Sequence, residues 1–226
     1  MYSNPKRVEI DHHTMKLIVG VIAISLATLT SFFAETPIQS ISASYYEGGW
    51  SRNIFVGFLF AISAFLLAYN GKSTSEMVLS KTAAIAAMGV AMFPCKCGDH
   101  PEIIPYVHGI SAVVMFVILA IFCYIFFQRA NGKGHFQAKL RAVIYAFCGI
   151  VIVTSILIIA IDNFTGGIIS SKINRLIFFC EAAALIAFGI AWLSASRILP
   201  LITSGKERLS LSPFSNREEK SGVDAK

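Results

Sequence analysis

The sequence is poor in charged residues. Asp, Glu, Lys and Arg make up 14% of its 226 residues, whereas a soluble globular domain carries about 25%. Hydrophobic residues make up 55%, and apolar runs approaching 20 residues recur along most of the chain. These features exclude an ordinary soluble domain and predict a polytopic membrane protein.

The sequence also lacks the motifs of the common enzyme classes. It contains no phosphate-binding loop, no dinucleotide fingerprint and no His-Glu-x-x-His metalloprotease motif. The serines between Gln39 and Ser44 are not set in the Gly-x-Ser-x-Gly turn that a hydrolase nucleophile needs. No motif indicates a cofactor, and we expect none.

The five cysteines are an odd number, so they cannot all pair within one chain. Cys123, Cys148 and Cys180 lie in apolar runs, where a cysteine behaves as a small hydrophobic residue. Only Cys95 and Cys97 lie in a loop.

The loop cysteines have three interpretations. With His100 and His108 they are weak candidates for a metal site, because the single residue between Cys95 and Cys97 is too few for the usual zinc spacing. A disulfide to another cysteine is an alternative. The favoured interpretation is a turn with two free or mutually protected thiols.

Six apolar runs predict an all-α transmembrane bundle of six spans. Each has about the 17–25 residues that a bilayer requires. The first is longer than a signal peptide's apolar region and lacks a good cleavage site, so we interpret it as an uncleaved span. The third is the least apolar, and its small side chains favour the bundle centre. The expected spans are 15–33, 53–69, 78–94, 106–127, 142–161 and 176–195, between an N-terminal segment 1–14 and a flexible tail 196–226.

The basic residues predict the orientation. Of the 19 Lys and Arg, 15 fall in the N-terminal segment, the second and fourth loops and the tail, and 4 fall in the other three loops. Positively charged loops stay in the cytoplasm, so both termini should be cytoplasmic. This pattern explains the net charge of +6 without a nucleic-acid partner. We expect a bacterial plasma-membrane protein surrounded by lipids, with a homo-oligomer or another membrane protein as partner.

This topology places several unusual polar residues at or near the outer face of the membrane. Glu181 is the only carboxylate inside an expected span, where an ionisable group needs a partner in the bundle interior. It is either a proton or cation site, or half of a structural ion pair with Arg52, His108 or Arg175. His108 is either a hydrogen-bonded interface residue or a group that shares a proton with Glu181 near neutral pH.

These residues predict an outward-facing polar pocket. Its candidate members are Glu181, His108, Arg52, Ser42 and Asp162. Such a pocket favours the binding or transport of a small solute, ion or lipid over catalysis. A structural membrane subunit that stabilises a partner is the alternative in which Glu181 serves assembly.

Three segments of the sequence form a recognisable set. They are Pro37–Tyr46 followed by Arg52–Gly57, Gly89–Pro94 followed by His108, and Glu181 with Ala187–Trp192. Together they resemble a family of bacterial six-span membrane proteins that is distantly similar to the DRAM-like proteins of eukaryotes. The resemblance implies a membrane location and a helical bundle, and no established reaction.

Ser42, His108 and Asp162 are also similar to a set of residues in the CREST membrane hydrolases, which pair serine, aspartate and histidines around a metal. The chain departs from that family in having six expected spans rather than seven. It also lacks a His-x-x-x-His motif in its last span. The resemblance implies a membrane-embedded metal-dependent hydrolase as an alternative function.

Overall fold

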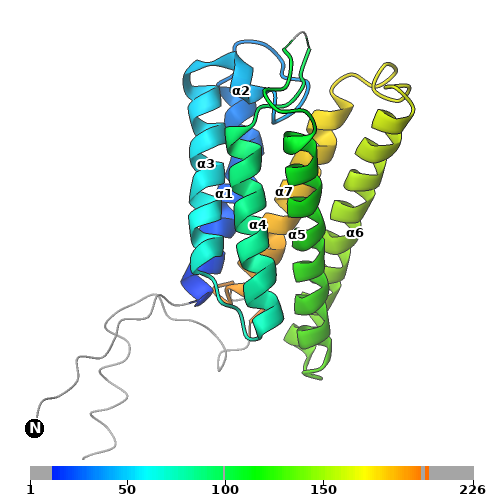
Figure 1. Cartoon of the computed structure of the whole chain (residues 1–226). Coiled ribbons are helices and arrows are strands. Elements are labelled where there is room, and N and C mark those ends of the chain that lie inside the picture. The colour runs from blue at the N-terminus through cyan, green and yellow to red at the C-terminus, as the bar shows by residue number, and fades with distance from the viewer. Residues whose placement is uncertain (1–11, 99, 200–201, 204–226) are drawn as a thin grey trace, which may run out of the picture.

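A computed structural model describes residues 12–98, 100–199 and 202–203 of the chain. In this part of the chain the regular elements are helices, which confirms the expected all-α class (Figure 1). The helices are α1 (His12–Phe32), α2 (Ser44–Glu47), α3 (Gly49–Ala68), α4 (Thr74–Met92), α5 (Val107–Asn131), α6 (Phe136–Phe164) and α7 (Leu176–Ala195).

Five of the helices, α1, α3, α5, α6 and α7, are long and apolar enough to cross a membrane. The protein is therefore a helical membrane protein. The sixth long helix, α4, has 19 residues but is not among the five. Its sequence carries Glu76 and Lys81 and is rich in alanine, which makes it less apolar than its neighbours.

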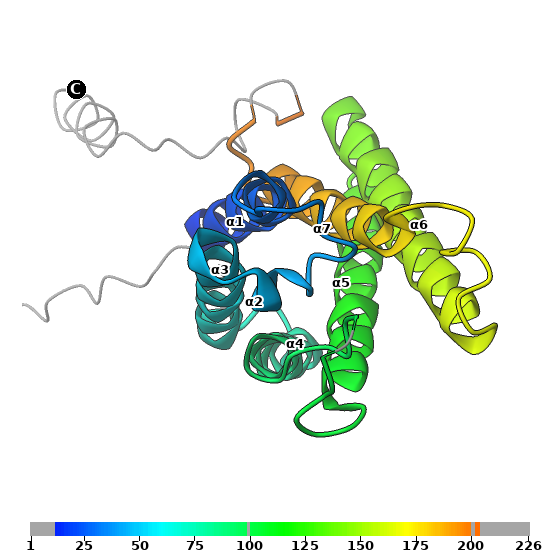
Figure 2. The ribbon, with the colours of Figure 1, turned by 90° about the horizontal axis from the view of Figure 1, so that it is seen from above.

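Helices α1, α3, α4, α5 and α7 form a ring (Figure 2). Around it α1 contacts α3, α3 contacts α4, α4 contacts α5 and α5 contacts α7, and α7 packs back onto α1. Helix α6 lies outside this ring against α5 and α7. The short α2 and the loop before it lie over the middle of the ring at one end.

The two described ends of the chain meet at one end of the bundle. His13 Nδ1, in the first turn of α1, lies 3.3 Å from the carbonyl oxygen of Ala195 at the end of α7. We call this end, with the loops after α3 and α5, the basic end. The opposite end, with residues 33–48, 93–98, 100–106 and 165–175, is called the site end. The predicted N-terminal segment and tail lie almost entirely outside the described residues.

Glycines allow α1 and α7 to approach closely. A Cβ atom on Gly189 would lie 2.7 Å from the carbonyl oxygen of Gly20 and 2.5 Å from a side-chain carbon of Ile24. A Cβ on Gly20 would lie 2.9 Å from the Gly189 carbonyl oxygen. Such contact between small residues is a common way for membrane helices to associate.

Helix α4 begins four residues earlier than the apolar run, at Thr74. Ser73 caps it by accepting a hydrogen bond from the Glu76 amide at 3.3 Å, and its hydroxyl donates to the Glu76 carboxylate at 3.2 Å. Ser73-Thr-Ser-Glu76 has the sequence of a capping box, which the apolar run does not reveal, but its glutamate accepts the Lys72 amide. Glu76 is buried and accepts two hydrogen bonds from the Arg129 guanidinium, an ion pair that the sequence analysis missed.

Candidate functional site

The loop between α1 and α2, residues 33–43, is held against the first turn of α7. The Phe178 amide donates to the Gln39 carbonyl oxygen at 3.0 Å. Arg175 donates from Nε to the Ile38 carbonyl oxygen at 2.8 Å and from its guanidinium to the Ser31 hydroxyl at 3.1 Å. We call residues 33–43 the cover loop, because they close the ring of helices at the site end.

Glu181 supports the cover loop from below. Its carboxylate accepts the Ile41 amide at 2.5 Å and the Ser42 hydroxyl at 3.3 Å. Glu181 therefore faces the bundle interior, as expected for an ionisable group on a membrane helix. Its hydrogen-bond partners are nevertheless a backbone amide and a hydroxyl of the cover loop rather than a cation.

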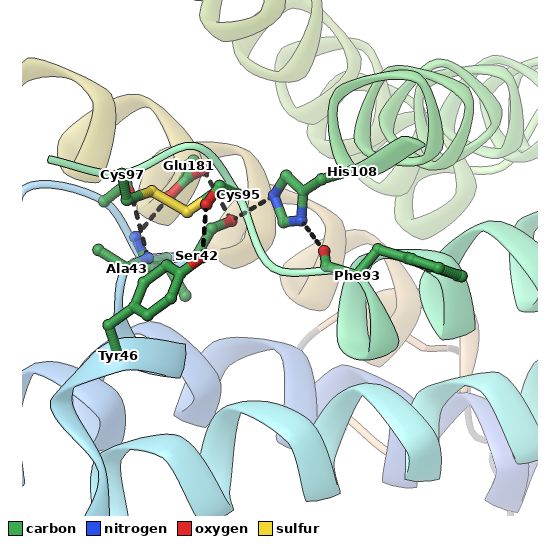
Figure 3. The surroundings of a disulfide bond; sticks show 10 residues. Ser42, Ala43, Tyr46, Phe93, Cys95, Cys97, His108 and Glu181 are labelled. Atoms are coloured by element: carbon green, nitrogen blue, oxygen red, sulfur yellow. Dashed lines mark hydrogen bonds between the residues drawn. A yellow bond between two sulfur atoms is a disulfide. The ribbon is translucent and has the colours of Figure 1, made fainter. Parts of the chain in front are cut away.

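His108 joins the same cluster from the first turn of α5. Its Nε2 lies 3.0 Å from the Ser42 hydroxyl oxygen and its Nδ1 lies 2.7 Å from the Phe93 carbonyl oxygen (Figure 3). Since the two contacts of Ser42 measure 3.0 and 3.3 Å, the imidazole Nε2 and the Glu181 Oε1 are at most about 6.3 Å apart. We call this series of contacts the His108–Ser42–Glu181 chain.

Both Ser42 contacts can be hydrogen bonds only with one proton more than neutral histidine and ionised glutamate supply. The Phe93 carbonyl can only accept, so Nδ1 of His108 is the donor in their hydrogen bond. Two contacts then remain, from Ser42 to Nε2 and from Ser42 to the carboxylate, but the Ser42 hydroxyl has a single hydrogen. A second hydrogen, on Nε2 or on Glu181, completes both contacts. This proton has two positions, one at each end of the His108–Ser42–Glu181 chain.

Two spaces have the cover loop as one of their walls. One is a cavity of about 20 Å³, lined by Ser42, Glu181 and apolar residues. This is room for about one water molecule. The other is a surface pocket of about 480 Å³, lined by residues that include Gln39, Ser40 and Tyr46. Among the described residues, Ser42 and Glu181 line the cavity and not the surface pocket.

Cys95 and Cys97 form a disulfide with each other beside the cover loop. In a disulfide neither sulfur is the thiolate that binds a metal. His100 stacks on the Tyr46 ring at a centroid distance of 4.1 Å, and His108 is engaged by Phe93 and Ser42. Of the four weak metal candidates, Cys95 and Cys97 are thus bonded to each other and both ring nitrogens of His108 have other partners. In the described part of the chain, no three His, Cys, Asp or Glu residues are placed to hold a metal ion.

Tyr46 ties the disulfide loop to α2. Its hydroxyl donates to the Cys95 carbonyl oxygen at 2.9 Å. Burial, and then the neighbouring Tyr45 and Glu102, raise the pKa of the Tyr46 hydroxyl. The hydroxyl is therefore protonated and acts as a donor. It holds the disulfide loop, whose Cys97 lines the surface pocket.

Three residues proposed from the sequence lie outside the His108–Ser42–Glu181 chain. Arg52 is exposed and its guanidinium carbon lies 4.3 Å from the centroid of the Tyr45 ring. Asp162 is buried and accepts the amides of Ile169 and Ser170, at 2.9 and 2.8 Å, which fixes the loop between α6 and α7. Arg175 anchors the cover loop.

The chain matches no protein-family model, curated protein or solved structure. Of the groups in the site, the Ile41 amide and the Phe93 carbonyl had no sequence signal, because every residue has such backbone groups.

Proposed function

We propose that the chain is a six-span protein of the bacterial plasma membrane that binds a small polar solute or ion at its outward end and links this binding to a proton. Both termini are cytoplasmic in this proposal. The binding region is the surface pocket, and the proton resides in the His108–Ser42–Glu181 chain.

The contact between the two described ends supports six spans. Because the start of α1 touches the end of α7, the chain traverses the bundle an even number of times between them. Helix α4 packs between α3 and α5 and supplies the sixth traverse. Its lower apolar character is compatible with a span that other helices cover.

The positions of the cations support the orientation. Lys16, Lys72, Arg129, Lys133 and Arg141 line one cavity at the basic end. Positively charged segments are retained in the cytoplasm, so the basic end faces the cytoplasm and the site end faces outward.

The observation on which the function rests is the contact of Ser42 with both His108 and Glu181, which one extra proton completes. When the proton leaves, one of the two Ser42 contacts loses its hydrogen and two lone pairs face each other. Buried polar groups without partners are costly, so deprotonation weakens the hold on the cover loop. Proton binding and the state of the surface pocket's floor are thereby linked.

Charge movement in liposomes tests this proposal. Full-length protein in liposomes is adsorbed on a solid-supported membrane, and the outer pH is stepped between about 5 and 8, where histidine commonly titrates. We expect a transient current in the wild type that is absent from the Glu181→Gln variant. Glu35→Gln, which removes an exposed carboxylate at the same end, is the matched control and should retain the current.

The same liposomes can be used to identify the solute from the current that it produces. Amino acids, sugars and monovalent cations are applied at constant pH, and a solute current that requires Glu181 identifies the cargo class. Equal pH-step currents in the wild type and the Glu181→Gln variant would refute proton binding at this site. If Glu181→Gln instead changed only stability or assembly, the structural-subunit alternative would replace the proposal.

The hydrolase alternative rests on a different observation, the 3.0 Å contact of the Ser42 hydroxyl with His108 Nε2. This is the geometry of a nucleophile and its base. Asp162, the third residue of the resemblance, instead binds the loop between α6 and α7. A fluorophosphonate that labels the wild type but not a Ser42→Ala variant would favour this alternative, as would stoichiometric zinc lost in His108→Ala.

A further inference from the structure

The basic end contains a second cavity, of about 220 Å³. Six cationic side chains line it, together with two histidines and a few aromatic and small residues. We call it the basic cavity. Its cations are Lys16, Lys72, Arg129, Lys133, Arg141 and Arg197.

Lys16 is a buried cation of the basic cavity to which the described residues offer no anion. Its side chain is 7% exposed, on a helix that crosses the bundle. Its ammonium lies 5.3 Å from the centroid of the Tyr69 ring and 5.1 Å from that of Phe126. Among the described residues it has no hydrogen-bond or ion-pair partner. Ring faces attract a cation only weakly compared with the cost of burying it, so the site favours an anion beside Lys16.

Among the described residues, the carboxylate in contact with these cations is Glu76. Glu76, the carboxylate beside the cavity, is bound by two guanidinium nitrogens of Arg129 and by the Lys72 amide. Desolvation, together with the charges of Arg197 and Arg129, lowers the pKa of Lys72, which lies in the loop between α3 and α4. The cations thus crowd one another around an open volume, as in an anion-binding site.

The geometry points to a phosphate group as the ligand of the basic cavity. Several ammonium and guanidinium donors around one space suit a compact anion with several acceptor oxygens. The volume is below that of a typical pocket for a drug-sized molecule, about 300–1,000 Å³, and therefore fits a head group. The cavity also lies where helices end, at the level where basic pockets between membrane helices meet lipid phosphates.

Two sources can supply this group, the head group of an anionic lipid or a soluble phosphate. Purified full-length protein in neutral detergent is titrated with dioleoyl phosphatidate in one arm and with inorganic pyrophosphate in the other. The midpoint of thermal unfolding is the measurement, because a ligand of the folded state raises it with concentration. A rise only with phosphatidate assigns the phosphate to a lipid, and a rise with pyrophosphate assigns it to a soluble anion.

Lys16→Met is the decisive variant, because it keeps the apolar stem and removes the charge. Without added anion it should unfold at a higher temperature than the wild type, since a buried unpaired cation has been removed. With anion its response should be weakened at least about ten-fold in concentration, the effect of one lost charged hydrogen bond. Lys139→Met removes an exposed charge from the same end and should leave the response unchanged.

A second variant keeps the test decisive if Lys16→Met fails to fold. Lys72→Gln changes an exposed residue of the cavity rim and should weaken the anion response several-fold. The inference is overturned if neither anion raises the wild-type midpoint. It is equally overturned if Lys139→Met weakens the response as much as the cavity variants do, because general surface charge would then explain it.

Discussion

Replacing Glu181 by glutamine should change how the free energy of unfolding depends on pH without disturbing the fold. The glutamine amide mimics protonated glutamate: its oxygen accepts the Ile41 amide and its NH2 donates to the Ser42 oxygen. Ser42 then donates to His108 Nε2, and every contact is made with a neutral imidazole.

The magnitude follows from counting protons. The wild-type chain of contacts binds one proton more than the Glu181→Gln variant when folded. Above about pH 5 an exposed glutamate is ionised, so the two unfolded chains bind equal numbers of protons. The free energy of unfolding changes with pH in proportion to the protons bound by the unfolded state minus those bound by the folded state. The variant should therefore gain about 1.4 kcal/mol relative to the wild type for each pH unit.

This gain continues with rising pH until the wild-type site releases its proton. The assay is denaturant or thermal unfolding of both proteins in the same detergent at a series of pH values above about 5. Glu181→Ala is the contrasting variant, because it leaves the buried Ile41 amide without its acceptor and should lose about 1–3 kcal/mol. A constant difference between wild type and Glu181→Gln across the series would refute the one-proton chain.

Three further predictions concern the scaffold. Gly189→Ala places a Cβ 2.5 Å from a carbon of α1 and should cost about 1–3 kcal/mol of unfolding free energy, whereas Gly57→Ala meets nothing within 4 Å and should be neutral or stabilising. Glu76→Ala should cost about 2–3 kcal/mol, discounted because its arginine partner is 33% exposed. The double change Cys95→Ser and Cys97→Ser should cost less than about 2 kcal/mol, because the closed loop is short. Unfolding of each purified variant checks these values, and opposite rankings would contradict the packing described.

The helices could be predicted from the sequence because each contains a long, uninterrupted apolar run. Each expected apolar run lies in one long helix, with ends that differ by up to about six residues. The largest differences occur where polar residues continue a helix beyond its apolar part. Helix α6 begins at Phe136 and passes through Lys139 and Arg141 before the apolar run starts. Hydrophobicity marks the part of a helix that can lie in lipid, whereas hydrogen bonding decides where the helix ends.

The sequence also predicted that Ser42, His108 and Glu181 lie near one another, because the expected order of the spans places all three at the same end of the bundle. Their partners did not follow from it. Glu181 is bound by a backbone amide, and Arg52, an expected partner, stacks on Tyr45 instead. Charge complementarity suggested that pair, but an exposed arginine gains little from it, and the fold of the cover loop decides which donors reach the carboxylate.

The contacts of the cover loop identify where it would move if the proposed linkage operates. Ile38 and Gln39 are held at the start of α7 by Arg175 and by the Phe178 amide, contacts that do not depend on the proton of the site. Ile41 and Ser42 are held by Glu181, in contacts that do depend on it. Loss of the proton therefore weakens one half of the loop and leaves the other half fixed. The change of backbone angles falls between Gln39 and Ile41, where the loop passes from lining the surface pocket to lining the cavity at Glu181.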